Sequence, residues 1–164
     1  MVLRNQTWSM VRRNHISTGI LLYSCMKMTV FDRSECFRAF LLLIGQDGII
    51  SHQERAILLE IGRMLDFERR FSETAIDDLL ENRHISTEPP LFSHQEIAIA
   101  FLKDAIRIAH ADKYFHSEEI VWLEAIAKKN GLKDEWVGDE IASRIPQDSV
   151  TSGEFEVGRY VTGG

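Results

Sequence analysis

Apolar residues recur at steps of three and four along most of the chain, a spacing that places them on one face of an α-helix. In the first half this pattern predicts a helix that begins near Ser34 and stops at Asp47-Gly48. A second helix is expected after Ser51, which opens a Ser-x-x-Glu tetrapeptide of capping-box form, and a shorter one over 73–82. No stretch alternates strongly enough to predict a β-strand.

The second half repeats this order of helices. Glu88-Pro89-Pro90 marks the connection, because proline fixes φ and lacks the amide proton that a helix interior needs. Ser93 opens a second Ser-x-x-Glu tetrapeptide, and further helices are expected over 117–129, which Asn130-Gly131 ends, and over 134–143. The sequence therefore predicts an all-α fold, a compact bundle of about six or seven helices built from two pseudo-symmetric helical hairpins.

Charge divides the chain into unequal parts. The net charge is +4 over residues 1–33 and −10 over the remaining residues, which gives −6 for the whole chain. We expect residues 1–33 to be a loosely ordered N-terminal extension, 34–145 to form the helical domain, and 146–164 to be a polar C-terminal tail. The net negative charge also argues against a nucleic-acid partner, which a protein grips by neutralising phosphates with basic residues.

The N-terminal extension also bears on where in the cell the protein is found. Its apolar stretch over 16–25 is shorter than the ~20 residues that span a bilayer, so no transmembrane segment is expected. Two interpretations of residues 1–27 stay open. They precede a natural start at Met26 or Met28, or they form a bacterial lipoprotein signal that anchors the chain through Cys25. We favour the first and expect a cytoplasmic protein.

The chain has two cysteines, Cys25 and Cys36, and no Cys-x-x-Cys motif. This disfavours a structural zinc site and a thioredoxin-like redox site. Cys36 lies among apolar residues and is expected to be a small buried side chain in a reducing compartment.

A repeated pair of acidic residues is the feature with most chemical content. At one and the same offset Asp47 aligns with Asp112 and Glu54 with Glu119, so each half has a Glu seven residues after an Asp. Along an unbroken helix these would lie ~10.5 Å apart, but a sharp turn can fold the two carboxylates together. If the hairpins pack about a pseudo-twofold axis, all four carboxylates converge. Like charges this close need a cation to neutralise them. Because the ligand atoms are oxygens, the favoured ions are Ca²⁺, Mg²⁺ and Mn²⁺.

Structural roles for the same residues stay open beside this one. Asp is a common turn residue, and Glu54 and Glu119 fit the reciprocal bond of a helix N-terminal cap. His110 and His116 flank Asp112 and are additional candidate ligands.

Two segments resemble the paired signatures of the tellurite-resistance TerB-like family, over about residues 34–143: Ile44-Gly45-Gln46-Asp47-Gly48-Ile49-Ile50-Ser51-His52-Gln53-Glu54 and Ala109-His110-Ala111-Asp112-Lys113-Tyr114-Phe115-His116-Ser117-Glu118-Glu119. The resemblance implies an all-helical bundle and a cation-binding acidic cluster, here Asp47, Glu54, Asp112 and Glu119. The family includes the N-terminal domain of a membrane-anchored DnaJ-like co-chaperone, which implies a protein partner and a membrane-associated complex. The second copy has Lys113 where the signature has Gly, and its ammonium can replace the metal.

No sequence feature favours an enzyme. The chain lacks a Gly-rich phosphate loop and a Gly-x-Ser-x-Gly motif. We expect a non-enzymatic TerB-like module that binds a divalent cation in a stress or tellurite-resistance-type response. The alternatives are a metal-free helical adaptor for protein–protein interaction or a co-chaperone-associated domain and, with less support, a carboxylate- or metal-dependent hydrolase.

Overall fold

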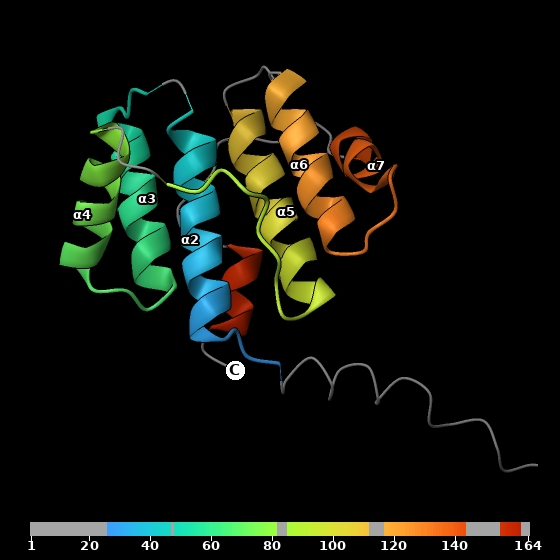
Figure 1. Ribbon diagram of the computed structural model, residues 1–164, viewed down its shortest axis with the longest axis horizontal. Coiled ribbons are helices and arrows are strands. Elements are labelled where there is room, and N and C mark those ends of the chain that lie inside the picture. The colour runs from blue at the N-terminus through green and yellow to red at the C-terminus, as the bar shows by residue number, and fades with distance from the viewer. Residues whose placement is uncertain (1–25, 47, 82–84, 112–116, 144–154, 162–164) are drawn as a thin grey trace, which may run out of the picture.

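Helices dominate the computed structural model, which describes residues 26–46, 48–81, 85–111, 117–143 and 155–161 (Figure 1). These ranges contain six α-helices, one 3-10 helix and no strand, so the predicted all-α fold is confirmed. The elements are α2 (Val30–Ile44), α3 (His52–Met64), α4 (Arg69–Leu80), α5 (Gln95–Ala111), α6 (Ser117–Lys129), α7 (Trp136–Ser143) and η1 (Glu156–Tyr160). None of the described helices is long and apolar enough to cross a membrane.

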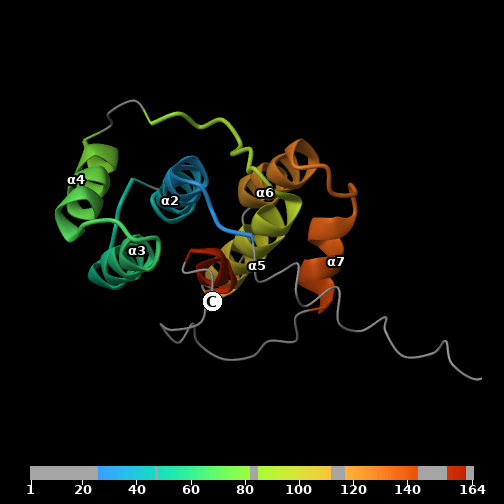
Figure 2. The same ribbon diagram turned by 90° about the horizontal axis from the view of Figure 1, so that it is seen from below.

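The helices form two units that meet at a central pair. Helices α2 and α5 pack side by side, α3 and α4 lie on the outer side of α2, and α6 and α7 lie on the outer side of α5 (Figures 1 and 2). The 3-10 helix η1 packs against α5. Each unit is thus a hairpin, α2–α3 or α5–α6, followed by a shorter helix.

The helix boundaries repeat in register. The interval between Val30 and Gln95, the first residues of α2 and α5, also separates both ends of α3 (His52–Met64) from those of α6 (Ser117–Lys129). The turn that follows each outer helix repeats as well. The Phe67 N–H donates to the Gly62 carbonyl at 2.9 Å, and the Leu132 N–H donates to the Ala127 carbonyl at 3.0 Å. The offset expected from the sequence is therefore also an offset of the fold.

The residues before Leu132 and Phe67 explain how these two helices end. Asp66 and Gly131 have φ angles of 64° and 75°, in the left-handed region that closes a helix with a Schellman motif. Glycine reaches this region without strain, whereas Asp is one of the few other residues that tolerate it. The Asn130-Gly131 stop predicted from the sequence is confirmed.

The start of α2 corrects the expected domain boundary. The helix begins at Val30 and not near Ser34, because Thr29 and Asp32 form a capping box in which each side chain accepts from the other residue's backbone N–H. Met28 is buried in the core as well. Residues 28–33, assigned above to the loose extension, therefore belong to the bundle, while Cys25 and its suggested lipid anchor lie outside the described residues.

The C-terminal boundary is also corrected. Residues 155–161, assigned above to a polar tail, fold onto the bundle because Phe155 and Val157 are apolar and bury almost completely. The ring of Phe155 lies 6.3 Å from that of Phe40 in the centre of the core. The Met28 N–H donates to the Tyr160 carbonyl at 2.8 Å, which joins the two ends of the described domain.

The core is continuous across both units. Phe40 of α2 and Phe101 of α5 stack at a centroid distance of 4.8 Å where the central helices meet. Cys36 is fully buried beside this contact as a free thiol, which confirms the expected burial. Burial raises the pKa of its thiol well above the ordinary value, as do the neighbouring charges of Asp104 and Asp32, so the protonated thiol is favoured over the thiolate.

Candidate functional site

The structure describes part of the predicted acidic cluster. Glu54, Glu119 and His110 lie within the described residues, whereas Asp47, Asp112 and His116 lie outside them. Among the residues that are described, no three His, Cys, Asp or Glu side chains are close enough together to hold a metal ion. Convergence of the four carboxylates therefore stays a prediction.

Glu54 has the structural role that its sequence context suggests. Its Oε2 accepts a hydrogen bond from the Ser51 N–H at 2.7 Å, and its own N–H donates to Ser51 Oγ at 3.2 Å. This is the capping box predicted for α3, and it engages one of the two carboxylate oxygens.

Glu119 corresponds to Glu54 in the second unit. Each is the third residue of its helix, α6 or α3, and each is half-buried. His110 is the penultimate residue of α5 and also half-buried. The C-terminal ends of α2 and α5, from which the chain turns into α3 and α6, lie at the same end of the bundle (Figure 1).

Ser93 does not form the second predicted capping box. Helix α5 begins at Gln95, and the Ser93 backbone N–H and hydroxyl both donate to the Asp32 carboxylate at 2.7 Å. The His94 carbonyl instead accepts the first N–H bonds of the helix. A Ser-x-x-Glu sequence fits either arrangement, so the sequence alone could not separate them.

Asp32 is a buried carboxylate that the sequence analysis did not single out. It is fully buried and accepts four hydrogen bonds, two from Ser93 and two from the N–H and hydroxyl of Thr29. Burial by itself would raise the pKa of Asp32, but the hydrogen bonds from Ser93 and Thr29 together outweigh it and the pKa is lowered. The Thr-x-x-Asp spacing before the first apolar stripe was the available sequence signal.

Asp104 is the second buried carboxylate missed in the sequence. It lies in the middle of α5, accepts from the backbone N–H groups of Glu156 and Val157 at 3.0 and 2.9 Å, and pairs with Arg107 at 3.1 Å. Burial raises its pKa to about 6 despite these donors. Its position within the apolar stripe of α5, three residues before Arg107, was the only sequence signal.

Both buried carboxylates are structural groups. Every hydrogen bond that they accept comes from this chain, and neither faces the groove described next. They attach segments to the central helices: Asp32 holds residue 93 to the start of α2, and Asp104 holds η1 to α5. Asp32 is 0% exposed and Asp104 is 1% exposed.

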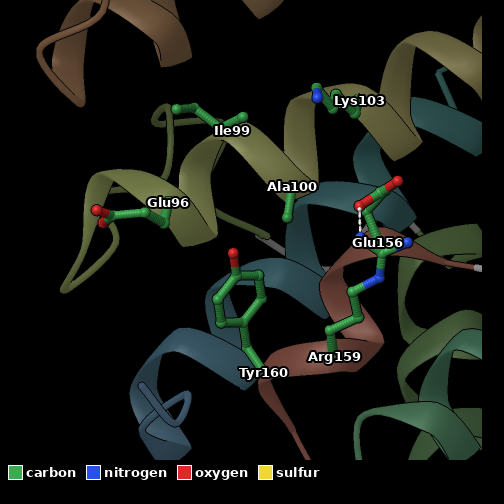
Figure 3. Close-up of a pocket in the computed structure, with 7 residues that line it drawn as sticks. All are labelled: Glu96, Ile99, Ala100, Lys103, Glu156, Arg159 and Tyr160. Atoms are coloured by element: carbon green, nitrogen blue, oxygen red, sulfur yellow. Dashed lines mark ion pairs between the residues drawn. The ribbon is translucent and has the colours of Figure 1, made fainter. Parts of the chain in front are cut away.

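A groove of about 350 Å³ runs between α5 and η1 (Figure 3). Ile99 and Ala100 form its floor, and Tyr160 of η1 closes it from the opposite side. Charged side chains complete the lining: Glu96, Lys103, Glu156 and Arg159. Its volume is at the lower end of the range for small-molecule sites. The sequence analysis missed this groove because it assigned η1 to a tail.

The resemblance to the TerB-like family rests on the two motifs in the sequence. Comparison of the chain with models of protein families, with curated proteins and with solved structures gives no match.

Proposed function

We propose that this chain is a non-enzymatic helical module that binds one divalent cation, Ca²⁺, Mg²⁺ or Mn²⁺, through Asp47, Glu54, Asp112 and Glu119. The observation that carries the proposal is the constant register between the helices of the two units. Because α3 and α6 begin at His52 and Ser117, Glu54 and Glu119 occupy the same position in equivalent helices. In the sequence, the segment that connects α2 to α3 contains Asp47 and the segment that connects α5 to α6 contains Asp112.

The arrangement of the central helices supports a shared site. Helices α2 and α5 pack against each other, and their C-terminal ends lie at the same end of the bundle (Figure 1). Four carboxylates gathered there would repel one another unless a cation neutralised them. His110 and His116 are the candidate additional ligands.

By its resemblance to the TerB-like family, we place the module in a stress or tellurite-resistance-type response, acting in the cytoplasm through a protein partner or a membrane-associated complex. We also propose that the module has no enzymatic role, because the sequence contains no Gly-rich phosphate loop and no Gly-x-Ser-x-Gly motif.

Thermal unfolding of the full chain tests the proposal. The midpoint is measured after EDTA treatment and again with millimolar Ca²⁺, Mg²⁺ or Mn²⁺, because an ion that binds only the folded state raises the midpoint. We expect a rise of several degrees with at least one ion and its loss in Asp112→Asn. Asp139→Asn is the matched control, since Asp139 is an exposed acid on α7.

The capping bond of Glu54 favours a second candidate, a metal-free helical adaptor or co-chaperone-associated domain, because it gives the carboxylate a purely structural role. In that case no ion shifts the midpoint, and Asp112→Asn changes it equally with and without ions.

A further inference from the structure

Two charged side chains in the groove between α5 and η1 have no partner of opposite charge among the described residues. Glu156 and Arg159 pair with each other at 2.8 Å and so neutralise one another (Figure 3). Glu96 and Lys103 are half-buried in the lining and form no ion pair within the part of the chain that the structure describes. Half-burying an unpaired charge costs free energy, which a ligand of opposite charge would recover.

The spacing of these two charges defines the ligand that fits. Glu96 and Lys103 lie seven residues apart on α5, which corresponds to ~10.5 Å along the helix axis. Between them the groove presents apolar surface from Ile99, Ala100 and the ring of Tyr160 (Figure 3). An extended peptide advances ~3.3–3.6 Å per residue, so three residues with free termini span the distance.

The wall formed by η1 is held in place before any ligand arrives. Asp104 accepts the N–H groups of Glu156 and Val157, and the Tyr160 carbonyl accepts from the Met28 N–H. Arg107 places its guanidinium 5.3 Å from the centre of the Phe155 ring and so adds a cation–π contact. A preformed wall lowers the ordering cost of binding.

We propose that the groove between α5 and η1 binds a short extended peptide with free termini, its ammonium at Glu96, its carboxylate at Lys103 and its side chains over Ile99, Ala100 and Tyr160. This site involves none of the four residues proposed to bind the cation. The two proposals can therefore be tested independently of each other.

Titration of the ¹⁵N-labelled full chain with the tripeptide Ala-Leu-Ala, followed by amide chemical shifts, tests the proposal. We expect shifts confined to α5 and η1. Glu96→Gln and Lys103→Gln should each weaken binding about fivefold, the effect of losing one partly exposed ion pair. Glu118→Gln and Lys128→Gln, which remove exposed charges on α6, should leave the affinity unchanged.

Blocked peptides assign each terminus to its residue. N-acetylation of the tripeptide should weaken binding to the wild type but cause no further loss in Glu96→Gln, and C-terminal amidation should behave likewise with Lys103→Gln. The circular dichroism spectrum of each variant shows whether it is folded. The proposal is overturned if no α5 or η1 amide shifts at about 10 mM peptide, a concentration that fills a millimolar site. Equal binding of free and doubly blocked peptides would overturn it as well.

Discussion

The two units of the bundle share the start of their first helix and both ends of their second helix, but they place their buried carboxylates at different positions. Asp32 lies in the first turn of α2, and the residue at its register position in α5 is Ile97. Asp104 lies in the middle of α5, and its counterpart in α2 is Ala39. Asp32 binds Ser93, which precedes α5, and Asp104 binds the backbone of η1, which follows both units. The repeat therefore determines the helices and their turns, while the buried charges determine what attaches to them.

The two carboxylates also differ in the hydrogen bonds that they accept and in the direction of their pKa shift. Asp32 accepts four hydrogen bonds and lies at a helix N-terminus, where the helix dipole favours negative charge, and its pKa is lowered. Asp104 accepts two backbone hydrogen bonds and one from Arg107 in the middle of a helix, and burial raises its pKa to about 6. The pKa of Asp32 falls because its four donors outweigh the effect of burial, whereas the pKa of Asp104 rises because burial in the middle of α5 outweighs its donors.

The largest effect is expected for Asp32→Ala. The substitution leaves two backbone N–H groups and two hydroxyls of Thr29 and Ser93 without their charged acceptor, and losing partly buried hydrogen bonds to a charged group is costly. We expect the free energy of unfolding in urea to fall by about 4 kcal/mol. Asp32→Asn keeps one acceptor oxygen and should lose less. A loss below about 1 kcal/mol for Asp32→Ala would mean that these donors reach water.

Asp104 should affect stability through pH. Its pKa is about 6 in the folded chain against an ordinary value of 3.8, so between these values the folded chain holds a proton that the unfolded chain has released. The free energy of unfolding should therefore fall as the pH rises from about 4 to above 6, by up to about 3 kcal/mol from this group. Urea unfolding of Asp104→Asn across this pH range should lack that contribution.

Asp32 provides the contrast when the same experiment is extended to pH values below its ordinary pKa of 3.8. Because its pKa is lowered, the stability that it contributes is present above its ordinary value and is lost as the pH falls through its pKa in the folded chain. The slopes removed by Asp32→Asn and Asp104→Asn should therefore have opposite signs. Slopes of the same sign would show that the two carboxylates are solvated alike.

The next largest effect is expected at Gly62, where the packing of the two units differs. A Cβ at Gly62 of α3 would lie 2.2 Å from Ser72 Oγ of α4, whereas the register position in α6 is a buried Ala127. Gly62→Ala should lower the free energy of unfolding by about 1–2 kcal/mol, because overpacking outweighs the helix propensity of Ala. A gain in stability would mean that α4 moves aside, and thermal unfolding of Gly62→Ala and Ala127→Gly measures both changes.

The smallest effect concerns the two left-handed residues that end α3 and α6. Gly131→Ala should cost about 1 kcal/mol because its φ of 75° strains a residue with a Cβ. Asp66→Gly removes the same strain but loses the exposed ion pair with Arg33, so we expect a change below about 1 kcal/mol. Denaturant midpoints of both variants measure the difference, and equal losses would contradict it.

The helices, their order and their offset could be predicted because each depends on local signals. The apolar stripes, the Ser51 capping box and the Asn130-Gly131 stop lie within one or two turns of the structure that they specify. The start of α2 was missed because the Thr29 and Asp32 pair precedes the apolar stripe. Its signal was present in the sequence but weaker than that of Ser34 and the residues after it.

The contacts between distant segments could not be predicted. Ser93 binds Asp32 across 61 positions, and Asp104 binds Val157 across 53. The composition of residues 146–164 indicates a tail. Within the described residues 155–161, Phe155 and Val157 are the buried ones, and two apolar residues give no periodic pattern. The groove between α5 and η1 depends on these contacts, so it could not be predicted from the sequence either.

Isothermal titration calorimetry of the metal-free full chain with Ca²⁺, Mg²⁺ and Mn²⁺ tests the central claim most directly. The account predicts that one of these ions binds at one site per chain and that Asp47→Asn and Asp112→Asn each weaken this binding, while Asp139→Asn leaves it unchanged. The absence of binding by all three ions, or equal binding in all three variants, would contradict it and leave the four acidic residues as turn and cap residues of a helical adaptor.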